Sequence, residues 1–281
     1  MALSSSGTDN VIAALGQSNR IYRVDLHLVA WKLENILAAM HILFPKLTYL
    51  QLWSRDETLV IPNSSFLDGS APRLRILTLN SIPFPELPKL LQSATQLVHL
   101  NHSAIPHSVF ISPKAMVSPL SVLSNLETFH LEFISPQSSP GLESQHLLPP
   151  ARSILPALVK FHFKGVTKYL EELVTRIDTP QLVEMNITYF NQIDFDCPRL
   201  VRFINCTSTL RARDEAHVQF DDSAASVLLR SSTSNGDLLI KISCRVPDWQ
   251  FSSIGQVCDS SLHPLSMVED LRIKHRFSEL V

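Results

Sequence analysis

Histidine is the residue type in this sequence whose spacing comes nearest to a metal site. His99, His102 and His107 lie close together in the chain, and His130 and His162 are expected on neighbouring strands. Zinc sites usually combine tightly paired ligands with a supporting acid or thiolate. No carboxylate or cysteine stands at ligand spacing beside these histidines. We therefore predict solvated or hydrogen-bonded histidines, with no metal site and no cofactor.

Acids paired with histidine are the second candidate chemistry, because such pairs can transfer protons. Asp25 precedes His27, and Asp214 and Glu215 precede His217. Pairs of this kind arise easily by chance, and neither has a nucleophile with a defined role. The sequence also lacks a nucleophile elbow, a phosphate-binding loop, a dinucleotide fingerprint and a His-Glu-x-x-His motif. We therefore expect a protein that is not an enzyme.

The composition narrows the possible partners. The chain has 281 residues, of which 45% are hydrophobic and 18% are charged, so a disordered chain is excluded. Its 24 basic and 26 acidic residues leave a net charge of -2, which gives no field to attract nucleic acid or an anionic membrane. The start of the chain has no signal-peptide pattern, and no apolar run is long enough to cross a bilayer. We expect a cytoplasmic or nuclear protein that contacts neither nucleic acid nor membrane.

Four cysteines are spread along the chain. They lie far apart in sequence and include no C-x-x-C pair, so neither a zinc knuckle nor a redox motif is supported. We predict buried free thiols at Cys197, Cys206, Cys244 and Cys258.

One short pattern, Leu-x-x-Leu-x-Leu, organises the chain and would position all of these side chains. Its clear copies have their apolar positions at Leu47/Leu50/Leu52, Leu74/Leu77/Leu79, Leu126/Phe129/Leu131, Leu158/Phe161/Phe163 and Leu182/Met185/Ile187. Weaker copies are Ile21/Val24/Leu26, Leu97/Leu100/His102, Leu200/Phe203/Asn205 and Val268/Leu271/Ile273. A proline often stands two residues before the first apolar position, as in Pro45-Lys46-Leu47. Because proline lacks an N–H and disfavours helix in its predecessor, it predicts the start of an extended strand.

Segments with helical spacing lie between these strands. They are marked by Leu33/Ile36/Leu37/Met40, Leu87/Leu90/Leu91, Met116/Leu120/Leu123 and Tyr169/Leu170/Leu173/Val174. One strand and one helix cannot bury their apolar faces alone, whereas stacked copies share a continuous core. We therefore predict an α/β fold: a leucine-rich-repeat solenoid with a curved parallel sheet and outer helices.

The C-terminal part of the chain departs from the repeat. Runs 216–220, 225–229 and 238–242 are strand-like, and Asn235-Gly236 is a hairpin signal, so we expect a small antiparallel β meander. The prediction is one leucine-rich-repeat domain over residues 1–281. It consists of an N-terminal segment at 1–19, irregular repeats at 20–206, the antiparallel insertion at 207–246, and a final helix and repeat strand at 247–281.

The residues between the apolar positions must point to the other side of the sheet, which is the concave side of a solenoid. Arg23, Asp25 and His27 occupy such positions in the first copy. The partner-binding residues that we predict on this face are Tyr49, Gln51, Trp53, Thr78, Asn80, His99, Asn101, His130, Glu132, Lys160, His162, Lys164, Glu184 and Asn186. Tyr49 and Trp53 would be the aromatic anchors that protein interfaces favour. The alternative is a sheet face that is merely solvated.

Several phrases resemble the repeat region of fungal F-box proteins: IDTPQLVEMNITYFNQIDFDCPRLVRFI, FKGVTKYLEELVTRI and PDWQFSSIGQVCDSSLHPL. The resemblance covers most of the chain from about Asn10 onward. It implies a substrate-recognition subunit of a cullin-type ubiquitin ligase, in which an F-box binds the ligase linker subunit and the repeats bind a protein target. No F-box motif precedes the first copy at Ile21, so the linker is an expected partner only if the full-length protein has an F-box. The alternative is a truncated repeat protein that binds a partner without any ligase role.

Overall fold

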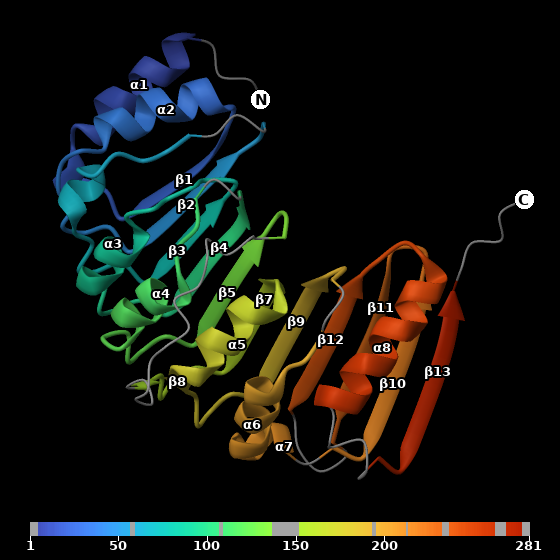
Figure 1. The fold of residues 1–281 in the computed structure, drawn as a ribbon. Helices are drawn as coiled ribbons and strands as arrows, with labels where there is room; N and C mark the ends of the chain where they lie inside the picture. The colour runs from blue at the N-terminus through green and yellow to red at the C-terminus, as the bar shows by residue number, and fades with distance from the viewer. Residues whose placement is uncertain are drawn as a thin grey trace, which may run out of the picture. The chain divides into compact units, whose positions relative to one another are not determined.

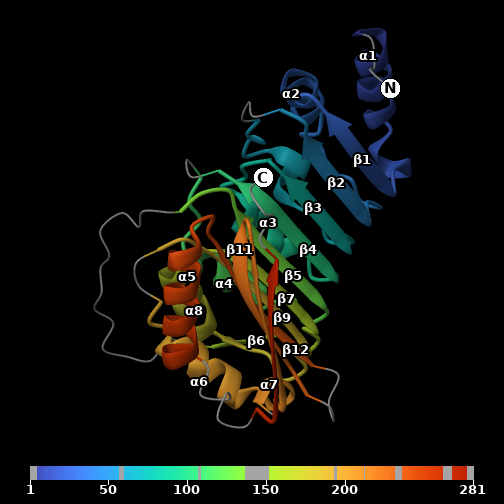
Figure 2. The same cartoon turned by 90° about the vertical axis from the view of Figure 1, so that its right-hand side faces the viewer.

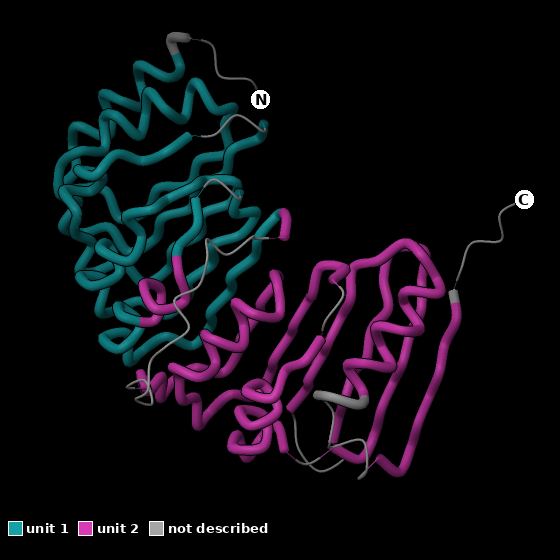
Figure 3. The backbone as a smooth tube through the Cα atoms, viewed as in Figure 1, with its two compact units in different colours: residues 1–111, 118–134 teal, residues 112–117, 135–281 magenta. Residues whose placement is uncertain are grey.

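A computed structural model describes residues 5–56, 60–106, 109–136, 152–192, 195–211, 213–231, 236–261 and 268–276. The fold is mixed α/β, with mostly parallel strands and helices alternating along the chain (Figure 1). The chain forms two compact units (Figure 3): unit 1 comprises residues 1–111 and 118–134, and unit 2 comprises residues 112–117 and 135–281. The chain crosses between the units at 111/112, at 117/118 within helix α4 (Pro113–Leu120), and at 134/135. The prediction of a single domain stays a prediction.

Unit 1 is built on a parallel sheet. Its strands, in spatial order, are β1 (Arg23–Leu28), β2 (Tyr49–Ser54), β3 (Ile76–Asn80), β4 (His99–Ile105) and β5 (Thr128–Phe133). The helices of the unit are α1 (Ser5–Leu15), η1 (Ser18–Arg20), α2 (Ala30–Ala39), η2 (Phe66–Gly69) and α3 (Leu87–Ser93). Helices α2 and α3 lie on one face of the strands, and α1 packs against α2 (Figures 1 and 2).

Unit 2 has a mixed sheet. Its strands, in spatial order, are β7 (Lys160–Gly165), β9 (Glu184–Phe190), β12 (Asp237–Ser243), β11 (Ala224–Arg230), β10 (Glu215–Asp221) and β13 (Asp270–Arg276). The short strands β6 (Ser153–Ile154) and β8 (Ile177–Asp178) form a separate parallel pair. The helices are α5 (Thr167–Thr175), α6 (Pro198–Cys206), α7 (Ser208–Arg211) and α8 (Pro247–Ser261). In Figure 2, α5, α6 and α8 lie on one side of these strands.

The repeat pattern fixes where each strand begins. Leu47, Leu74, Leu97, Leu126, Leu158 and Leu182 are all fully buried, and a strand starts two residues after each of them. The turn at this point is held by one carbonyl that accepts two successive N–H groups from the next repeat. The carbonyl of Thr48 accepts the N–H groups of Arg75 and Ile76 at 2.8 and 3.1 Å, and that of Val98 accepts from Glu127 and Thr128 at the same two distances. The strands therefore stay in register.

Apolar side chains from the second and third pattern positions form the core beneath the helices. Leu50, Leu77 and Leu100 are neighbours in one row across unit 1, and Phe161, Met185 and Leu238 form a row in unit 2. The predicted helices are confirmed as α2, α3, α4, α5 and α8, and the predicted meander is confirmed as the antiparallel set β10, β11 and β12. The meander lies within the sheet, because β12 pairs in parallel with β9 and β10 pairs in parallel with β13.

Side chains from one repeat cap helices of a neighbouring repeat. Asp56, just after β2, accepts the N–H of Ala30 at the start of α2 at 3.0 Å. Gln192, just after β9, accepts the N–H of Thr167 at the start of α5 at 3.2 Å. The first N–H groups of a helix have no acceptor within the helix, so these side chains supply hydrogen bonds that would otherwise be missing.

Three predictions about particular segments were wrong. The copy at Leu200 and Phe203 is not a strand but part of helix α6, because Pro198 occupies its first turn and Leu200, Phe203 and Ile204 form a buried helical stripe. Leu271 and Ile273 of the last copy do form strand β13, but they are 57% and 66% exposed. All four cysteines were predicted to be buried, but Cys206 is exposed and Cys258 is partly exposed, whereas Cys197 and Cys244 are buried. The helix α1 was not predicted.

Candidate functional site

The predicted partner-binding residues lie on the face of each sheet that is opposite the helices. Residues two apart along a strand point to the same side, and their neighbours in the other set are buried: Leu50 and Leu52 flank Gln51, and Leu77 and Leu79 flank Thr78. We call these side chains the polar face of unit 1 (strands β1 to β5) and the polar face of unit 2 (strands β7 to β13). The predicted alternation is confirmed, whereas partner binding stays a prediction.

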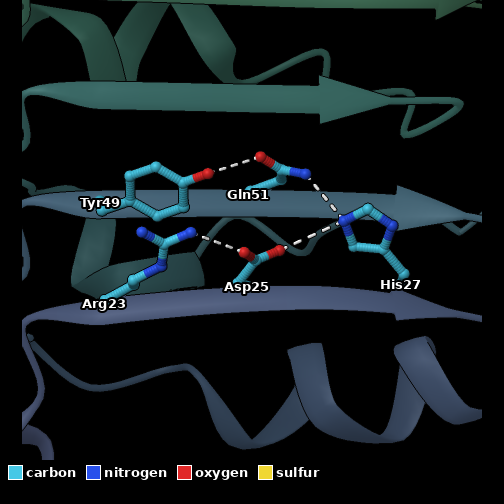
Figure 4. A network of polar contacts seen from close by, with 5 residues as sticks. All are labelled: Arg23, Asp25, His27, Tyr49 and Gln51. Carbon is cyan, nitrogen blue, oxygen red and sulfur yellow. Dashed lines mark hydrogen bonds and ion pairs between the residues drawn. The ribbon is translucent and has the colours of Figure 1, made fainter.

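A network of polar contacts joins β1 to β2 on the polar face of unit 1 (Figure 4). Arg23 and His27 both contact Asp25, with N–O distances of 2.8 and 3.2 Å. Gln51 is hydrogen-bonded to His27 at 2.7 Å and accepts the hydroxyl of Tyr49 at 2.6 Å. The hydrogen bond that Arg23 donates to the carboxylate of Asp25 raises the pKa of Arg23, which therefore stays charged. The network fixes side chains from two strands in one arrangement.

Aromatic rings complete this patch. The guanidinium carbon of Arg23 lies 3.8 Å from the centre of the Tyr49 ring, in cation–π geometry. The rings of His27 and Trp53 have their centres 5.0 Å apart, and Trp53 is 43% exposed. A half-exposed tryptophan that is held in place from one side can bury a large area at low entropic cost when a partner binds. We refer to Arg23, Asp25, His27, Tyr49, Gln51 and Trp53 as the aromatic patch.

The remaining predicted residues of unit 1 continue the polar face across β3, β4 and β5. Gln51, Thr78, Asn101 and His130 are successive neighbours in one row. A second row brings Tyr49, Ile76 and His99 together. Asn80 donates from Nδ2 to Ser103 Oγ at 2.9 Å, and His130 lies 3.4 Å from Glu132. The described part of this face is therefore polar and half-buried, with neutral hydrogen-bonding groups at its centre.

A second network lies on the polar face of unit 2, between β7 and β9. Glu184 contacts Lys160 at 3.0 Å and His162 at 3.5 Å, and Asn186 donates to Glu184 at 2.9 Å. Asn186 is also hydrogen-bonded to His162 at 3.1 Å. Burial raises the pKa of Glu184, but the hydrogen bonds and the positive charge of Lys160 outweigh it, so the net shift is downward. The carboxylate is thus held in its charged form.

The meander extends this face with residues that were not predicted to bind a partner. The ladder places Leu239 beside Asn186, Leu228 beside Leu239, and His217 beside Leu228. A shallow hollow of about 180 Å³ lies here, lined mainly by His217, Gln219, Ser226, Leu228, Leu239, Arg272 and Lys274. Ligand pockets for small molecules usually have volumes of about 300 Å³ or more. The period of two in each meander strand could have indicated these positions, but only the strand order reveals that they adjoin Asn186.

The histidine group that could have bound a metal is divided by the fold. His99 is on the polar face, whereas His102 is fully buried on the other side of β4 and is hydrogen-bonded to the carbonyl of Ile82 at 3.0 Å. Burial lowers the pKa of His102 to about 4. His107 lies outside the described residues. Within the described part of the chain, no three histidine, cysteine or acidic residues are grouped as metal ligands.

The two predicted pairs of an acid and a histidine are close in the structure, so each carboxylate can orient the imidazole beside it. Asp25 lies 3.2 Å from His27, and Glu215 lies 3.7 Å from His217. Such a pair can orient an imidazole for proton transfer or for hydrogen bonding to a bound group. Both pairs lie on an open sheet face.

Comparison with known proteins gives no relative to guide the assignment. No protein family model matches this chain, no curated protein matches it, and no solved structure matches it significantly. Among the helices in the described ranges, none is long and apolar enough to cross a membrane.

Proposed function

We propose that this chain is a protein-recognition scaffold of the leucine-rich-repeat type and that the polar face of unit 1 binds a protein partner. The observation that carries the proposal is the aromatic patch on the side of the sheet away from the helices. A hydrogen bond and a cation–π contact hold Tyr49 there, and Trp53 packs against the ring of His27. Interfaces draw most of their binding energy from a few aromatic and arginine side chains of this kind.

Three further observations support recognition of a protein. The polar face mixes charged, amide and aromatic groups, which suits the varied surface of a folded partner or an extended segment. The balanced charge of the chain favours a partner that is recognised by shape and by local hydrogen bonds. The strands repeat at nearly constant register, so side chains from successive repeats line up in rows that a long segment could follow.

The resemblance to fungal F-box proteins supports a version of this proposal in which the recognition serves a ubiquitin ligase. In that setting the polar face would hold the protein to be modified, and a linker subunit would connect the chain to a cullin in the cytoplasm or nucleus. A scaffold without a ligase role would use the same face. The two versions differ in whether linker and cullin subunits accompany the partner, and not in the surface that the partner covers.

Site-specific photo-crosslinking tests the proposal. A photoreactive phenylalanine analogue replaces Trp53, and in a second variant it replaces Trp31, a 56% exposed tryptophan on helix α2. Both variants are expressed in fungal cells, irradiated, and analysed by mass spectrometry. We expect a specific set of crosslinked proteins at position 53 that is absent at position 31. Identical sets at the two positions, or no crosslinked protein at position 53, would contradict the proposal.

A matched pair of alanine variants then measures the contribution of the patch. Once a partner is identified, Trp53→Ala should weaken its binding at least tenfold, which corresponds to about 1.4 kcal/mol. Trp31→Ala removes the same side chain from the helix side and should leave the affinity within about twofold. Co-purification of linker and cullin subunits with the wild-type chain distinguishes the ligase version from a plain scaffold.

A further inference from the structure

Strand β13 is an edge strand whose apolar side chains are exposed. Among the described residues it pairs only with β10, so one side of its backbone has no strand beside it. Leu271 and Ile273 are 57% and 66% exposed, although they occupy the positions that are buried in the other strands. Helix α8 packs mainly over β11 and β12, which are not at this edge of the sheet. A seven-residue edge strand with exposed aliphatic side chains is a template for pairing with another strand.

We propose that a second copy of this chain pairs with β13, strand against strand in antiparallel orientation, to form a two-fold symmetric dimer. This interaction is separate from the partner binding proposed for unit 1. A two-fold axis perpendicular to the sheet keeps the helix-bearing faces of both copies on the same side. The exposed aliphatic side chains of the two copies therefore meet one another.

The backbone geometry of β13 decides which residues can bond across the axis. The N–H of Asp270 donates to the carbonyl of Asp214 at 3.0 Å, so the even-numbered residues of β13 turn their backbone groups toward β10. The backbone groups of Leu271, Ile273 and His275 then point to the open edge. These odd-numbered residues form the hydrogen-bonded pairs of the proposed interface.

The side chains select one register among those that the symmetry allows. When the axis passes through Arg272, Leu271 faces Ile273 of the other copy, Asp270 faces Lys274, and Glu269 faces His275. Each contact occurs twice. Aliphatic pairs and opposite charges facing each other stabilise antiparallel strands by about 0.2–1 kcal/mol per pair. The unfavourable contact is Arg272 against Arg272, and each guanidinium is already bonded to its own Asp270 at 2.7 Å.

The two neighbouring registers are less complementary. With the axis at Leu271, Asp270 faces Arg272, which is favourable, but the carboxylate of Glu269 faces Ile273. Leu271 then faces only its counterpart in the other copy, so one aliphatic pair replaces two. With the axis at Ile273, Arg272 faces Lys274, and like charges meet twice. The register centred on Arg272 is therefore the one that combines two aliphatic pairs with opposite charges facing each other.

The apolar contact extends beyond the strand itself. Phe251 of α8 is 49% exposed, and its ring centre lies 4.4 Å from that of Phe220 on β10. Phe220 is the neighbour of His275 in the ladder between β10 and β13. Phe251 thus flanks the aliphatic row on the helix-bearing side, so both copies would contribute an aromatic ring beside the four aliphatic side chains.

The mass of the full-length chain in solution, measured by light scattering from micromolar to low millimolar concentration, tests the dimer. We expect the mass of two chains at the upper end. Ile273→Glu should raise the dimer dissociation constant at least tenfold, whereas Ile154→Glu, at a 59% exposed isoleucine on β6, should leave it within twofold. Because Ile273 is exposed, the melting temperature of the variant at low concentration should match that of the wild type. A wild-type chain that is monomeric throughout would overturn the proposal.

Charge exchange and crosslinking test the register. Asp270→Lys should weaken the dimer, and adding Lys274→Asp should restore it, because the exchanged charges again face each other across the axis. Arg272→Cys should give a disulfide-linked dimer on mild oxidation. Directly opposed residues of an antiparallel pair that do not hydrogen-bond to each other have Cα atoms about 4.5 Å apart, which is within disulfide reach. Lys274→Cys, which faces Asp270, is the control and should not self-link. Failure of the double variant to restore the dimer, or crosslinking through Leu271→Cys in place of Arg272→Cys, would overturn this pairing.

Discussion

The carboxylate of Glu171, in helix α5, accepts the N–H of Leu200 at the start of helix α6, with 2.7 Å between Oε1 and N. Its other oxygen accepts the N–H of Arg199 at 3.0 Å. The residue before α6, Cys197, makes no side-chain cap of its own. Glu171 is 9% exposed, and its burial raises its pKa although the two N–H groups act in the opposite direction. One side chain from α5 therefore holds the first turn of its neighbour.

Removing this cap should destabilise unit 2 of the protein. Glu171→Ala leaves two N–H groups without an acceptor, and we expect a loss of about 2 kcal/mol in the free energy of unfolding, measured by urea denaturation. Glu172→Ala, the next residue of the same helix, removes only an ion pair with Arg176 and should cost less than about 0.5 kcal/mol. Equal losses in the two variants would contradict the role given to Glu171.

The buried His102 should make the protein less stable in mild acid. Its folded-state pKa of about 4 is below the ordinary value of 6.5, so the unfolded chain binds a proton more readily between these values. Above pH 6.5 this effect is absent. Stability should decline as the pH falls from 6.5 toward 4, by up to about 3 kcal/mol.

Two variants isolate the contribution of His102, measured by urea denaturation at a series of pH values. His102→Leu carries no titratable group, and His102→Gln also carries none but keeps a donor for the carbonyl of Ile82. Both should show a shallower decline between pH 6.5 and 4 than the wild type. A decline that is unchanged in both variants would assign it to other groups.

Replacing glycine with alanine should change the stability of the protein in opposite directions at two positions. A Cβ added at Gly236 would lie 2.6 Å from the carbonyl oxygen of Thr209, so Gly236→Ala should cost about 2 kcal/mol. A Cβ at Gly255, which is exposed in helix α8, would meet nothing within 4 Å. Gly255→Ala should therefore stabilise the protein by about 0.5–1 kcal/mol, since glycine is unfavourable within helices. Thermal melting of both variants checks the two signs.

The pairing of Lys160 with Glu184 should add little to stability. Both side chains are partly exposed, at 52% and 29%, so a double-mutant cycle with Lys160→Met and Glu184→Gln should give a coupling below about 1 kcal/mol at pH 7. The folded-state pKa of Glu184 lies below the ordinary value of 4.5, so its contribution is present above pH 4.5 and is lost as the pH falls through the lower value. A coupling that persists well below this range would contradict the assignment.

Much of the fold could be predicted from periodicity. Leu47, Leu50 and Leu52 mark the end of a turn and the inward side of a strand, and the same spacing locates β3, β5, β7 and β9. Helix α5 follows from the spacing of Tyr169, Leu170 and Leu173. Local periodicity is sufficient here because each element buries one apolar face against its neighbours.

Other features depend on contacts that local patterns do not contain. The spacing of Leu200 and Phe203 fits both a repeat strand and a helix, and the N–H acceptors supplied by Glu171 favour the helix. Leu271 and Ile273 have the period of inward residues, but periodicity does not reveal that they are exposed. His27 and Gln51 are 24 residues apart in the chain, and their contact could be predicted only if the register of β1 and β2 were known.

The side-chain caps between repeats determine the direction in which local unfolding of one element destabilises another. Asp56 caps a helix that begins 26 residues earlier, so a substitution that displaces the end of β2 should also fray the start of α2. Gln192 caps α5 in the same way, so displacing the end of β9 would also loosen the start of α5. Glu171 works the opposite way and ties the later helix α6 to the earlier α5. Helix α5 is thus fastened from both sides, so we expect it to exchange its amide protons among the slowest of the helices, and α2 to open whenever β2 does.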